Sequence, residues 1–305
     1  MTSANSCVLC GADCPVSIVT QDLNRRVSQT DFQYRRCGRC ELLFLSNPPS
    51  HLGEHYPAGY VTPPRTLARL QRIADQNRHQ LDLLLRFVRP GRLLEIGPGY
   101  GSFLWLAKSA GFSVSAIESD EAACEYLEQS VRTHVIRSTA PDQVLASTAE
   151  EYQAIVLWHA LEHLPDPWQT LREASQRLSD GGVIVIATPN PHAWQFQRLG
   201  RYWPHIDAPR HLWLIPLEAL RSFLEPLGLT LAFATSDDPA GKSWNRFGWS
   251  QALLNLQPRF LRHTFAAKVV TRVLGHVVGF SARPWERAEL RGSAYTAVFQ
   301  KRSLS

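Results

Sequence analysis

From residue 92 onward, the chain alternates between short apolar runs and longer stretches in which apolar positions recur at helical spacing. The apolar runs, which predict buried strands, lie at residues 93–96, 114–117, 134–136, 154–158 and 183–187. The stretches with helical spacing lie at residues 102–110, 120–131, 141–147 and 167–178. Strands that alternate with helices in this way build a parallel sheet with helices on both faces. The pattern therefore predicts an α/β domain whose ligands bind beyond the carboxyl ends of the strands.

The segments before this domain have a different pattern. Residues 17–20 and 32–35 have the composition of two short strands, with turn residues around them. Residues 47–64 are rich in proline and predict an irregular linker, and residues 67–88 place most of their leucines on one face of a helix. We therefore expect a small module over residues 1–46, a linker and helix over 47–91, and a main domain over 92–305.

Four of the six cysteines form two pairs with the spacing Cys-x-x-Cys, namely Cys7 with Cys10 and Cys37 with Cys40. Two such pairs are the ligand set of a zinc ribbon, because each tight turn presents two thiolates to one tetrahedral ion. A module of this size has too little core to fold by burial alone, so we expect structural zinc. Cys14 could compete as a ligand. Two disulfides are the alternative, which the absence of a signal-peptide pattern disfavours.

The composition is that of an ordinary globular protein, with 305 residues of which 44% are hydrophobic and 19% charged. No run of 18 or more consecutive apolar residues occurs, so no membrane-spanning helix is predicted, and a cytoplasmic location is expected. The net charge of +5 is unevenly distributed, since residues 93–180 carry 13 acidic and 5 basic side chains. An acidic central domain does not favour phosphate binding. We therefore expect a small-molecule substrate and no nucleic-acid partner.

The first strand of the main domain leads into three alternate glycines, Gly97, Gly99 and Gly101, with Pro98 between the first two. Alternate glycines let the backbone turn sharply and let a ligand approach it closely. Their spacing is one residue shorter than that of a dinucleotide-binding loop, which disfavours an oxidoreductase. Glu95 precedes the first glycine by two residues, and its carboxylate would repel a pyrophosphate. It suits a cationic ammonium or sulfonium group instead.

The second strand ends in Glu118 and Ser119, and a carboxylate at a strand tip can accept hydrogen bonds from both hydroxyls of a ribose. The segment from Glu95 to Gly101 and the acid at Glu118 resemble the first motif and the ribose-binding acid of the class I S-adenosylmethionine-dependent methyltransferases. The resemblance runs in order and spacing over residues 90–188. It implies that S-adenosylmethionine is the cofactor, with its methionine end on the glycine loop.

The same resemblance implies a Rossmann-like sheet of seven strands with helices on both faces, in which the last strand is antiparallel. Residues 229–235 and 293–300 are then the candidates for the last two strands, with a helical insertion between them over residues 240–285. Thr139 and Ala140, which follow the third strand, would lie against the adenine.

The fourth strand leads into Trp158 and His159, followed by Glu162 and His163. This stretch resembles the fourth-strand motif of methyltransferases related to the ubiquinone O-methyltransferases, in which Glu-x-x-Glu-His can hold a divalent cation. Here His159 replaces the first glutamate. The resemblance implies that Trp158 and His159 contact the cofactor and that a divalent cation binds near Glu162 and His163. The alternative is that Glu162 and His163 cap the following helix.

Residues 188–213 form a long loop that is dense in aromatic residues and histidines, and such loops are usually functional. Residues 207–212, with the pattern Asp-x-Pro-Arg-His-Leu before a helix that starts near Pro216, resemble a subset of these enzymes. Many members of that subset also carry an N-terminal zinc-ribbon-like segment, as do certain deoxysugar C-methyltransferases. The candidate substrate-binding residues are Tyr202, Trp203, Asp207 and Arg210. The candidate catalytic residues, chosen because imidazole titrates near neutrality, are His159, His163, His205 and His211. For Asp207 and Arg210, a mutual salt bridge that holds the loop is the alternative.

Residues 264–279 carry Lys268, Arg272 and His276 at intervals of four, with a wide apolar face beside them. A helix of this kind either packs on the domain as a lid or makes peripheral contact with an anionic membrane. The sequence as a whole predicts methyl transfer from S-adenosylmethionine to a small-molecule acceptor, with a sugar or a lipid-linked intermediate as the suggested class. A catalytically silent cofactor-binding or recruitment module with a zinc ribbon is the alternative.

Overall fold

The computed structural model describes residues 5–56, 62–262, 264–288 and 290–302. The chain divides into two compact units that are interleaved along the sequence. Unit 1 comprises Met1–Ala58, Thr188–Leu220 and Thr235–Tyr295, and unit 2 comprises Gly59–Ala187, Arg221–Ala234 and Thr296–Ser305. The main domain expected over residues 92–305 therefore includes residues of both units.

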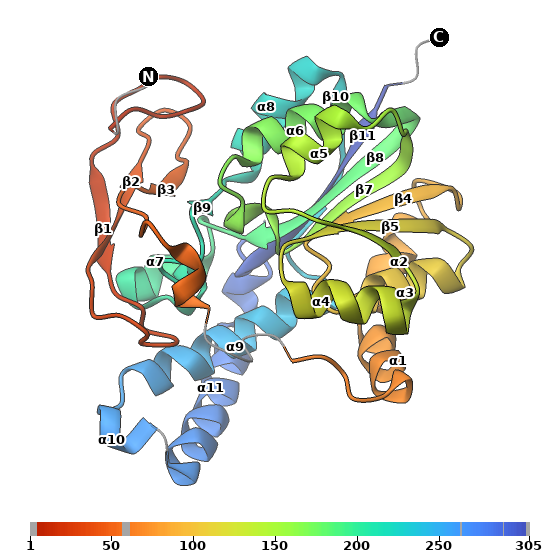
Figure 1. The fold of residues 1–305 in the computed structure, drawn as a ribbon. Helices are drawn as coiled ribbons and strands as arrows, with labels where there is room; N and C mark the ends of the chain where they lie inside the picture. The colour runs from red at the N-terminus through yellow and green to blue at the C-terminus, as the bar shows by residue number, and fades with distance from the viewer. Residues whose placement is uncertain (1–4, 57–61, 263, 289, 303–305) are drawn as a thin grey trace. The chain divides into compact units, whose positions relative to one another are not determined.

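A seven-stranded sheet with the order β10-β11-β8-β7-β4-β5-β6 is the framework of unit 2 (Figure 1). Its strands are β4 (Arg92–Ile96), β5 (Ser113–Glu118), β6 (His134–Arg137), β7 (Tyr152–Trp158), β8 (Leu178–Pro189), β10 (Leu229–Thr235) and β11 (Ala294–Lys301). The five strands from β4 to β8 pair in parallel. All seven predicted strands are present, so the expected Rossmann-like sheet is confirmed.

The last strand runs against its neighbours, as the resemblance implied. At one end of the β8–β11 pair, Asn190 N donates a hydrogen bond to Ser293 O at 2.9 Å, and at the other end Gln300 Nε2 donates to Gly181 O at 3.0 Å. The numbering thus rises along one strand as it falls along the other, and β11 is antiparallel to β8.

Helices cover both faces of this sheet. One layer contains α1 (Leu67–Gln76), α2 (Arg78–Leu84), α3 (Ser102–Ser109) and α4 (Glu121–Tyr126), and the other contains α5 (Pro141–Ser147) and α6 (Pro167–Gln176) (Figure 1). The α8 helix (Leu217–Leu224) begins next to Pro216, as expected. The core between the sheet and the first layer includes Leu93, Phe103, Leu104, Ala116 and Leu127.

Two of the predicted helices are interrupted. The single helix expected over residues 67–88 is wrong, because Asn77 leaves the helical conformation and separates α1 from α2. Asparagine competes with the helix by bonding elsewhere, and here Asn77 Nδ2 donates to Ser102 Oγ at 3.4 Å. The stretch expected over residues 120–131 is α4 followed by a π-helical turn, Leu127–Val131.

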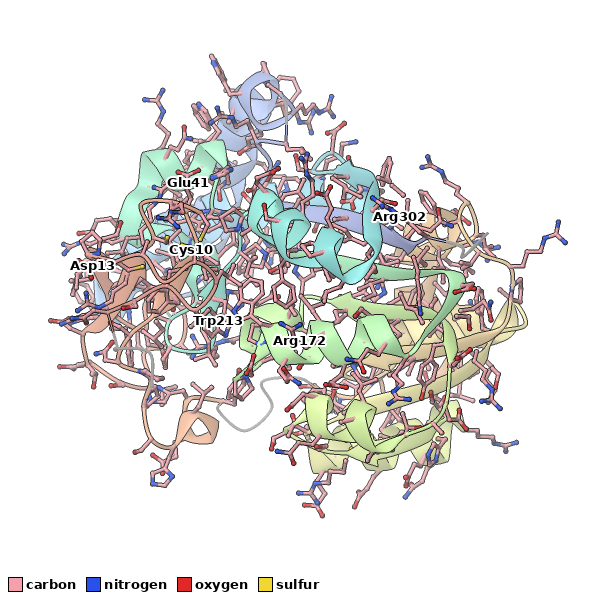
Figure 2. All side chains as sticks on the ribbon, turned by 90° about the horizontal axis from the view of Figure 1, so that it is seen from above. Cys10, Asp13, Glu41, Arg172, Trp213 and Arg302 are labelled. Carbon is pink, nitrogen blue, oxygen red and sulfur yellow. The ribbon has the colours of Figure 1, made fainter. Side chains whose placement is uncertain are left out.

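Unit 1 contains a four-stranded antiparallel sheet with the order β1-β2-β3-β9. Its strands are β1 (Val16–Thr20), β2 (Phe32–Arg36), β3 (Leu43–Leu45) and β9 (Trp213–Leu214). The first two were predicted, but β3 and β9 are too short for a periodicity to indicate them. Figure 2 shows Cys10 and Asp13 on the N-terminal module and Trp213 on β9. The module predicted over residues 1–46 therefore has its sheet completed by residues 213–214.

The helices of unit 1 include α7 (Trp194–Leu199), α9 (Pro239–Asn255), α10 (Arg259–Arg262) and α11 (Phe265–Glu286), together with the 3-10 turns Leu52–His55, Gly200–Tyr202 and Pro204–Ile206. By length and composition, α11 is the one helix in the described ranges that could cross a membrane. The expectation of no such helix rested on unbroken apolar runs, and Lys268 and Arg272 interrupt the run in α11.

Candidate functional site

The glycine loop after β4 has a conformation that only glycine adopts readily. Gly97, Gly99 and Gly101 have φ angles of 70°, 54° and 71°. A Cβ atom on Gly97 would lie 2.7 Å from Ala160 Cβ, and one on Gly101 would lie 2.4 Å from Leu127 Cδ2. A Cβ atom on Gly99 would meet nothing within 4 Å. The outer glycines are thus required by packing inside the protein, whereas Gly99 borders open space that a ligand can approach.

Glu118 ties this loop to the end of β5. Its Oε2 accepts a hydrogen bond from Gly99 N at 3.0 Å, and its Oε1 accepts from Ser119 N at 2.7 Å and from Asp120 N at 3.0 Å. Backbone donors therefore hold the buried carboxylate in place beside Gly99. Each carboxylate oxygen has two lone pairs, so Oε1 is fully used by its two backbone donors, and Oε2 can accept one more hydrogen bond from a ligand hydroxyl.

Glu95 is the second carboxylate of the site, and it is buried. Burial raises its pKa to about 8, and the negative charge of Glu118 acts in the same direction. Within the described part of the chain, Glu95 Oε2 has no hydrogen-bond partner. A buried carboxyl oxygen without a donor is costly, and such atoms in native proteins call for an explanation. An ammonium donor from a ligand would satisfy this oxygen, so Glu95 and Glu118 together fit the amino and ribose groups of S-adenosylmethionine.

Trp158 and His159 lie where β7 ends. The Trp158 ring packs 5.4 Å from the Phe103 ring, and His159 N donates to Ala187 O at 2.8 Å. His159 has a φ of 55°, which is uncommon for a residue with a side chain. Such conformations cluster at functional sites. Its Nδ1 lies 3.5 Å from Oε1 of the fully buried Glu162.

The capping alternative for Glu162 and His163 is wrong. These two residues lie in the short 3-10 turn Leu161–His163, and the α6 helix begins four residues later. Its cap is Asp166, whose side chain accepts a hydrogen bond from Gln169 N at 2.9 Å. A divalent cation near Glu162 and His163 stays a prediction.

Thr139 and Ala140, which are predicted to lie against the adenine, have defined local contacts, and so does Tyr100 in the glycine loop. Thr139 and Ala140 come directly before α5, and Ala140 N donates to Ser138 Oγ at 3.0 Å. Tyr100, which the sequence analysis passed over, lies between the last two glycines and packs its ring edge-on against Tyr126 at 5.5 Å. Burial raises the pKa of Tyr100, and the negative charges of Asp120 and Glu118 add to this shift. The position of Tyr100 inside the glycine motif was the feature of the sequence that could have marked it as a site residue. Contact of Thr139 and Ala140 with adenine stays a prediction.

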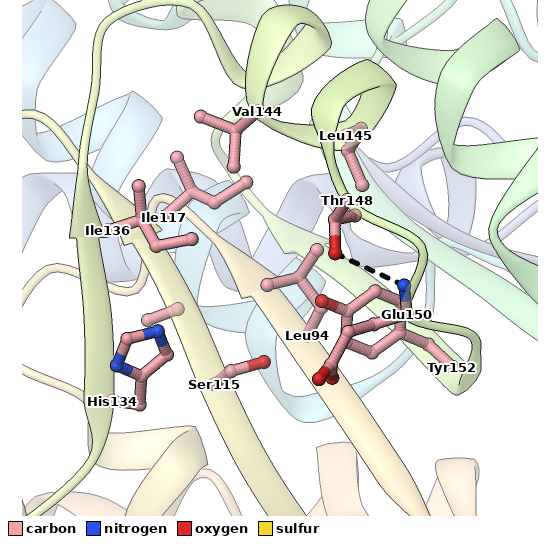
Figure 3. Close-up of a pocket in the computed structure, with 11 residues that line it drawn as sticks. Leu94, Ser115, Ile117, His134, Ile136, Val144, Leu145, Thr148, Glu150 and Tyr152 are labelled. Carbon is pink, nitrogen blue, oxygen red and sulfur yellow. Dashed lines mark hydrogen bonds between the residues drawn. The ribbon is translucent and has the colours of Figure 1, made fainter.

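A cavity of about 160 Å³ lies elsewhere in unit 2, between the sheet and α5 (Figure 3). It is lined by Leu94, Ser115, Ala116, Ile117, His134, Ile136, Val144, Leu145, Thr148, Glu150 and Tyr152. None of the residues predicted to bind the cofactor or the substrate is among them. The cavity therefore gives no support to the predicted site and does not belong to it.

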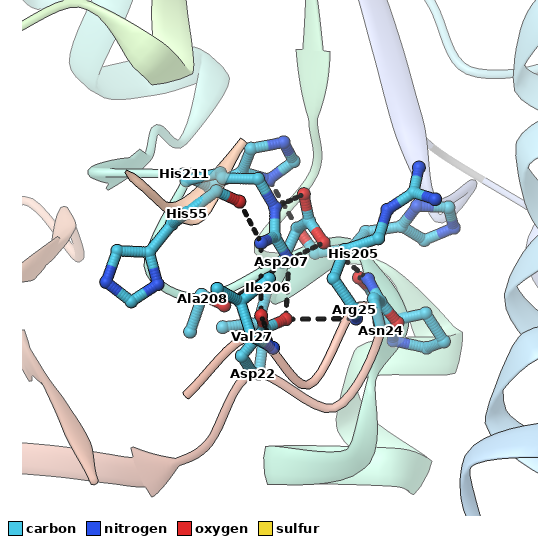
Figure 4. Close-up of polar contacts among 12 residues, drawn as sticks. Asp22, Asn24, Arg25, Val27, His55, His205, Ile206, Asp207, Ala208 and His211 are labelled. Atoms are coloured by element: carbon cyan, nitrogen blue, oxygen red, sulfur yellow. Dashed lines mark hydrogen bonds and ion pairs between the residues drawn. The ribbon is translucent and has the colours of Figure 1, made fainter. Parts of the chain in front are cut away.

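In unit 1, Arg210 is fully buried, and Figure 4 labels its partners Asp22, Asp207 and His55. Its Nη2 donates to Asp22 Oδ1 at 2.7 Å and to Asp207 Oδ1 at 2.8 Å, its Nε donates to Asp207 Oδ2 at 2.8 Å, and its Nη1 donates to His55 O at 3.0 Å. Burial alone would raise the pKa of Asp207, but hydrogen bonds from Arg210 outweigh burial and hold it well below the ordinary value. This geometry favours the loop-holding alternative for Asp207 and Arg210, with Asp22 as a partner that the sequence did not indicate.

The two histidines of this loop are also buried. His205 Nε2 lies 3.0 Å from Trp244 O, and His211 Nδ1 lies 2.8 Å from His205 O. Because a carbonyl oxygen only accepts, each of these nitrogens carries its proton. Trp203 is buried and donates its Nε1 hydrogen to Gln195 Oε1 at 3.0 Å, whereas Tyr202 is partly exposed. Catalytic roles for the histidines and substrate contacts for Tyr202 and Trp203 stay predictions.

The two Cys-x-x-Cys pairs converge. The Sγ atoms of Cys7, Cys10, Cys37 and Cys40 all lie within 4.8 Å of one another, and two of the separations are 3.4 Å. A tetrahedral zinc ion with bonds of about 2.3 Å places its sulfurs about 3.8 Å apart, so the cluster has the right dimensions. The cysteines are free thiols rather than disulfides.

Local hydrogen bonds favour a thiolate at Cys37, whereas burial raises the pKa of Cys7 and Cys40 in the same cluster. Burial would raise the pKa of Cys37, but the backbone N–H groups of Cys40 and Arg39 outweigh it and lower the pKa to about 6. The thiolate is the form that binds metal. Cys14 lies outside the group of four, and burial raises its pKa to about 12.

The sequence model of a family described as "Methyltransferase domain" matches residues 67–232, which is more than half of the chain. The chain belongs to this methyltransferase family. The match covers α1, the glycine loop and both carboxylates, and it ends in β10. Together with the strand order and the geometry of the loop, it confirms the resemblance to class I S-adenosylmethionine-dependent methyltransferases that the motifs predicted.

Curated relatives of this methyltransferase include the ubiquinone biosynthesis O-methyltransferase of Caulobacter sp. (strain K31). It is 29% identical over 185 residues, which span 53% of this chain and 73% of that protein. The enzyme of the same name from Caulobacter vibrioides is 30% identical over 167 residues, or 50% of this chain and 66% of that one. Among solved structures, a mycolic acid cyclopropane synthase in complex with SAH is 16% identical, with a TM-score of 0.49 and coverage of 73% of this chain and 82% of that chain.

Proposed function

We propose that this methyltransferase acts on a small molecule, and that its acceptor is a lipid-linked or sugar intermediate in biosynthesis. The proposed binding of S-adenosylmethionine rests on two buried carboxylates, Glu95 and Glu118, and on Gly99, which borders open space. The names of the curated relatives, which are ubiquinone biosynthesis O-methyltransferases, support a hydroxyl acceptor on a lipid-linked molecule.

In this proposal each residue of the loop has a stated task. Glu95 receives the ammonium group of S-adenosylmethionine, Glu118 accepts a hydrogen bond from a ribose hydroxyl, and Gly99 lets the backbone come close to the methionine end. When bound, S-adenosylmethionine supplies a methyl group on a sulfonium, which an oriented nucleophile can attack in line. His159 is the candidate base in unit 2, because it stands at the carboxyl end of β7 with its backbone held by Ala187.

Transfer of labelled methyl groups tests the proposal. The enzyme is incubated with S-adenosylmethionine and two acceptor sets, hydroxylated polyprenyl phenols and nucleotide sugars. Methylation of a member of either set, lost in Glu118→Ala, supports the proposal. If S-adenosylhomocysteine binds but neither set is methylated, the acceptor class is wrong. The catalytically silent module is then the better account.

We propose that zinc occupies the Cys7, Cys10, Cys37 and Cys40 group, with a structural task. The four sulfurs have the spacing of a tetrahedral site, and one ion would hold the two Cys-x-x-Cys turns together. The expected metal content is one zinc per chain, lost in Cys37→Ser and kept in the matched control Cys14→Ser. Iron in place of zinc, or equal loss in both variants, would contradict this assignment. The measurement is elemental analysis of the purified variants.

A further inference from the structure

The hairpin of α9 and α11 in unit 1 has one packed face and one exposed apolar face. The small residues of α11, Thr271, Gly275, Gly279 and Ala282, are buried. A Cβ atom on Gly275 would lie 2.3 Å from Ser250 Oγ of α9, so the two helices touch along this side. Figure 1 shows them side by side. The large apolar residues that remain exposed on α11 are Phe265, Val269, Val270, Val273, Leu274, Val277, Val278, Phe280 and Trp285.

The large apolar side chains of the hairpin are unusually exposed to solvent. Phe265 and Phe280 are 83% and 67% exposed, and Phe260 of α10 is 77% exposed. Scattered exposed hydrophobic residues are ordinary, but a contiguous patch marks a surface that another body covers. Phe247 of α9 and Leu256, which follows α9, are also exposed, at 50% and 59%.

The charge of this segment is of one sign. Residues 239–285 contain seven lysines and arginines and no aspartate or glutamate, and Glu286, the acidic residue at the end of α11, is buried. On α11, Lys268, Arg272, His276 and Arg283 are exposed. At 100° per residue, Arg272, His276 and Arg283 fall on one flank, between the face packed on α9 and the apolar half opposite it. A basic flank beside a wide apolar face is the pattern of a helix that lies in the interface of an anionic bilayer.

We propose that the α9–α11 hairpin docks on an anionic lipid bilayer, with α11 in the plane of the interface and its apolar half among the acyl chains. The charges of the hairpin favour this arrangement over a dimer of the chain and over a membrane-spanning α11. A second copy of the chain would bring two basic, acid-free surfaces together, which costs free energy. A bilayer-spanning α11 would place Arg272 and His276 in the hydrocarbon, where charged side chains are expensive.

The test is co-sedimentation of the full-length protein with vesicles of phosphatidylcholine, with or without phosphatidylglycerol. Binding is expected only with phosphatidylglycerol, and it should weaken as salt is added. The variant Lys268→Gln/Arg272→Gln should bind on the order of 30-fold more weakly at low salt. The variant Val273→Gln/Val277→Gln removes apolar area while keeping the charge, and should lose at least about tenfold.

Two matched controls carry the same substitutions on exposed residues of α1 and the end of α2. Arg69→Gln/Arg72→Gln and Leu67→Gln/Leu85→Gln should bind vesicles like the wild type, since these residues lie outside the hairpin. An equal loss in the controls would overturn the proposal, because the binding would then be unspecific.

Three further results would also overturn it. They are no binding to anionic vesicles, a lipid-free dimer that Val273→Gln/Val277→Gln dissociates, and retention of the protein on membranes washed with alkaline carbonate. Circular dichroism confirms that the variants are folded. Because the readout is sedimentation, the result is independent of whether the proposed acceptor is correct.

Discussion

The glycine loop of unit 2 and the aromatic loop of unit 1 are both rich in residues that chemistry uses, but they are built in opposite ways. In the glycine loop, Glu95 is left with an unsatisfied oxygen among the described residues, and Gly99 borders open space. In the aromatic loop, Arg210 donates hydrogen bonds to Asp22, Asp207 and the backbone of His55. Unsatisfied polar capacity indicates a ligand, whereas satisfied capacity indicates a fold-stabilising network. The same types of residue thus have different meanings in the two loops.

The largest loss of stability is expected for substitution of Arg210, which tests whether the aromatic loop is a fold-stabilising network. Arg210→Ala leaves Asp22 and Asp207 buried without their cation, and should lower the free energy of unfolding by about 3–5 kcal/mol. Chemical denaturation measures this loss. The control is Arg198→Ala, an exposed arginine of the same loop, which should cost under about 1 kcal/mol. If Arg210→Ala kept full stability and instead raised the KM for the acceptor, Arg210 would be a substrate ligand after all.

The next largest effects are expected at Gly101 and Gly99, which compare a packed position with an open one within the glycine loop. Gly101→Ala adds left-handed strain and a contact with Leu127, so it should lower the free energy of unfolding by about 2–4 kcal/mol. Gly99→Ala adds the strain alone, about 1–2 kcal/mol, because its methyl group meets open space. It should nevertheless weaken S-adenosylhomocysteine binding. Thermal denaturation and titration of both variants measure the two effects, and normal binding by Gly99→Ala would show that the space is not a ligand site.

Glu95→Gln has the smallest effect on the fold, and its sign depends on pH. The folded protein holds the Glu95 proton up to a pKa of about 8, against an ordinary 4.5, so wild-type stability is lost as pH rises through this window. Glutamine has no charge to bury. The variant should therefore match the wild type near pH 4.5 and become increasingly more stable than it up to about pH 8.

The same substitution should weaken binding of S-adenosylhomocysteine about tenfold, because a charge-assisted hydrogen bond to the ammonium is lost. Calorimetry across the pH range measures both changes. A stability difference that does not vary with pH would show that Glu95 is already ionised and paired in the free protein.

The sequence predicted the residues whose role follows from neighbours along the chain. The glycine loop after Ile96 and the acid Glu118 could be predicted because each directly follows a strand with a clear apolar pattern. The metal cluster could be predicted because each Cys-x-x-Cys pair is a local motif. Asp166 rather than Glu162 caps α6, and its place directly before Pro167, the first residue of the helix, was the signal in the sequence.

The sequence did not predict contacts that join distant segments. Asp22 and Arg210 are 188 residues apart, and β9 pairs with β3 across a similar separation. Neither has a periodicity or a spacing that points to its partner. The break at Asn77 was missed for another reason, since the apolar face of the helix continues on both sides of it.

Calorimetric titration with S-adenosylhomocysteine tests the central claim most directly, namely that Glu95, Glu118 and the glycine loop form a nucleoside-binding site. The wild type should bind one equivalent. Glu118→Ala should bind at least about tenfold more weakly, since it loses a hydrogen bond from a ribose hydroxyl to a charged group. The control Glu121→Ala, which removes an exposed carboxylate three residues later, should bind normally. Absence of binding by the wild type, or equal binding by Glu118→Ala, would contradict the claim.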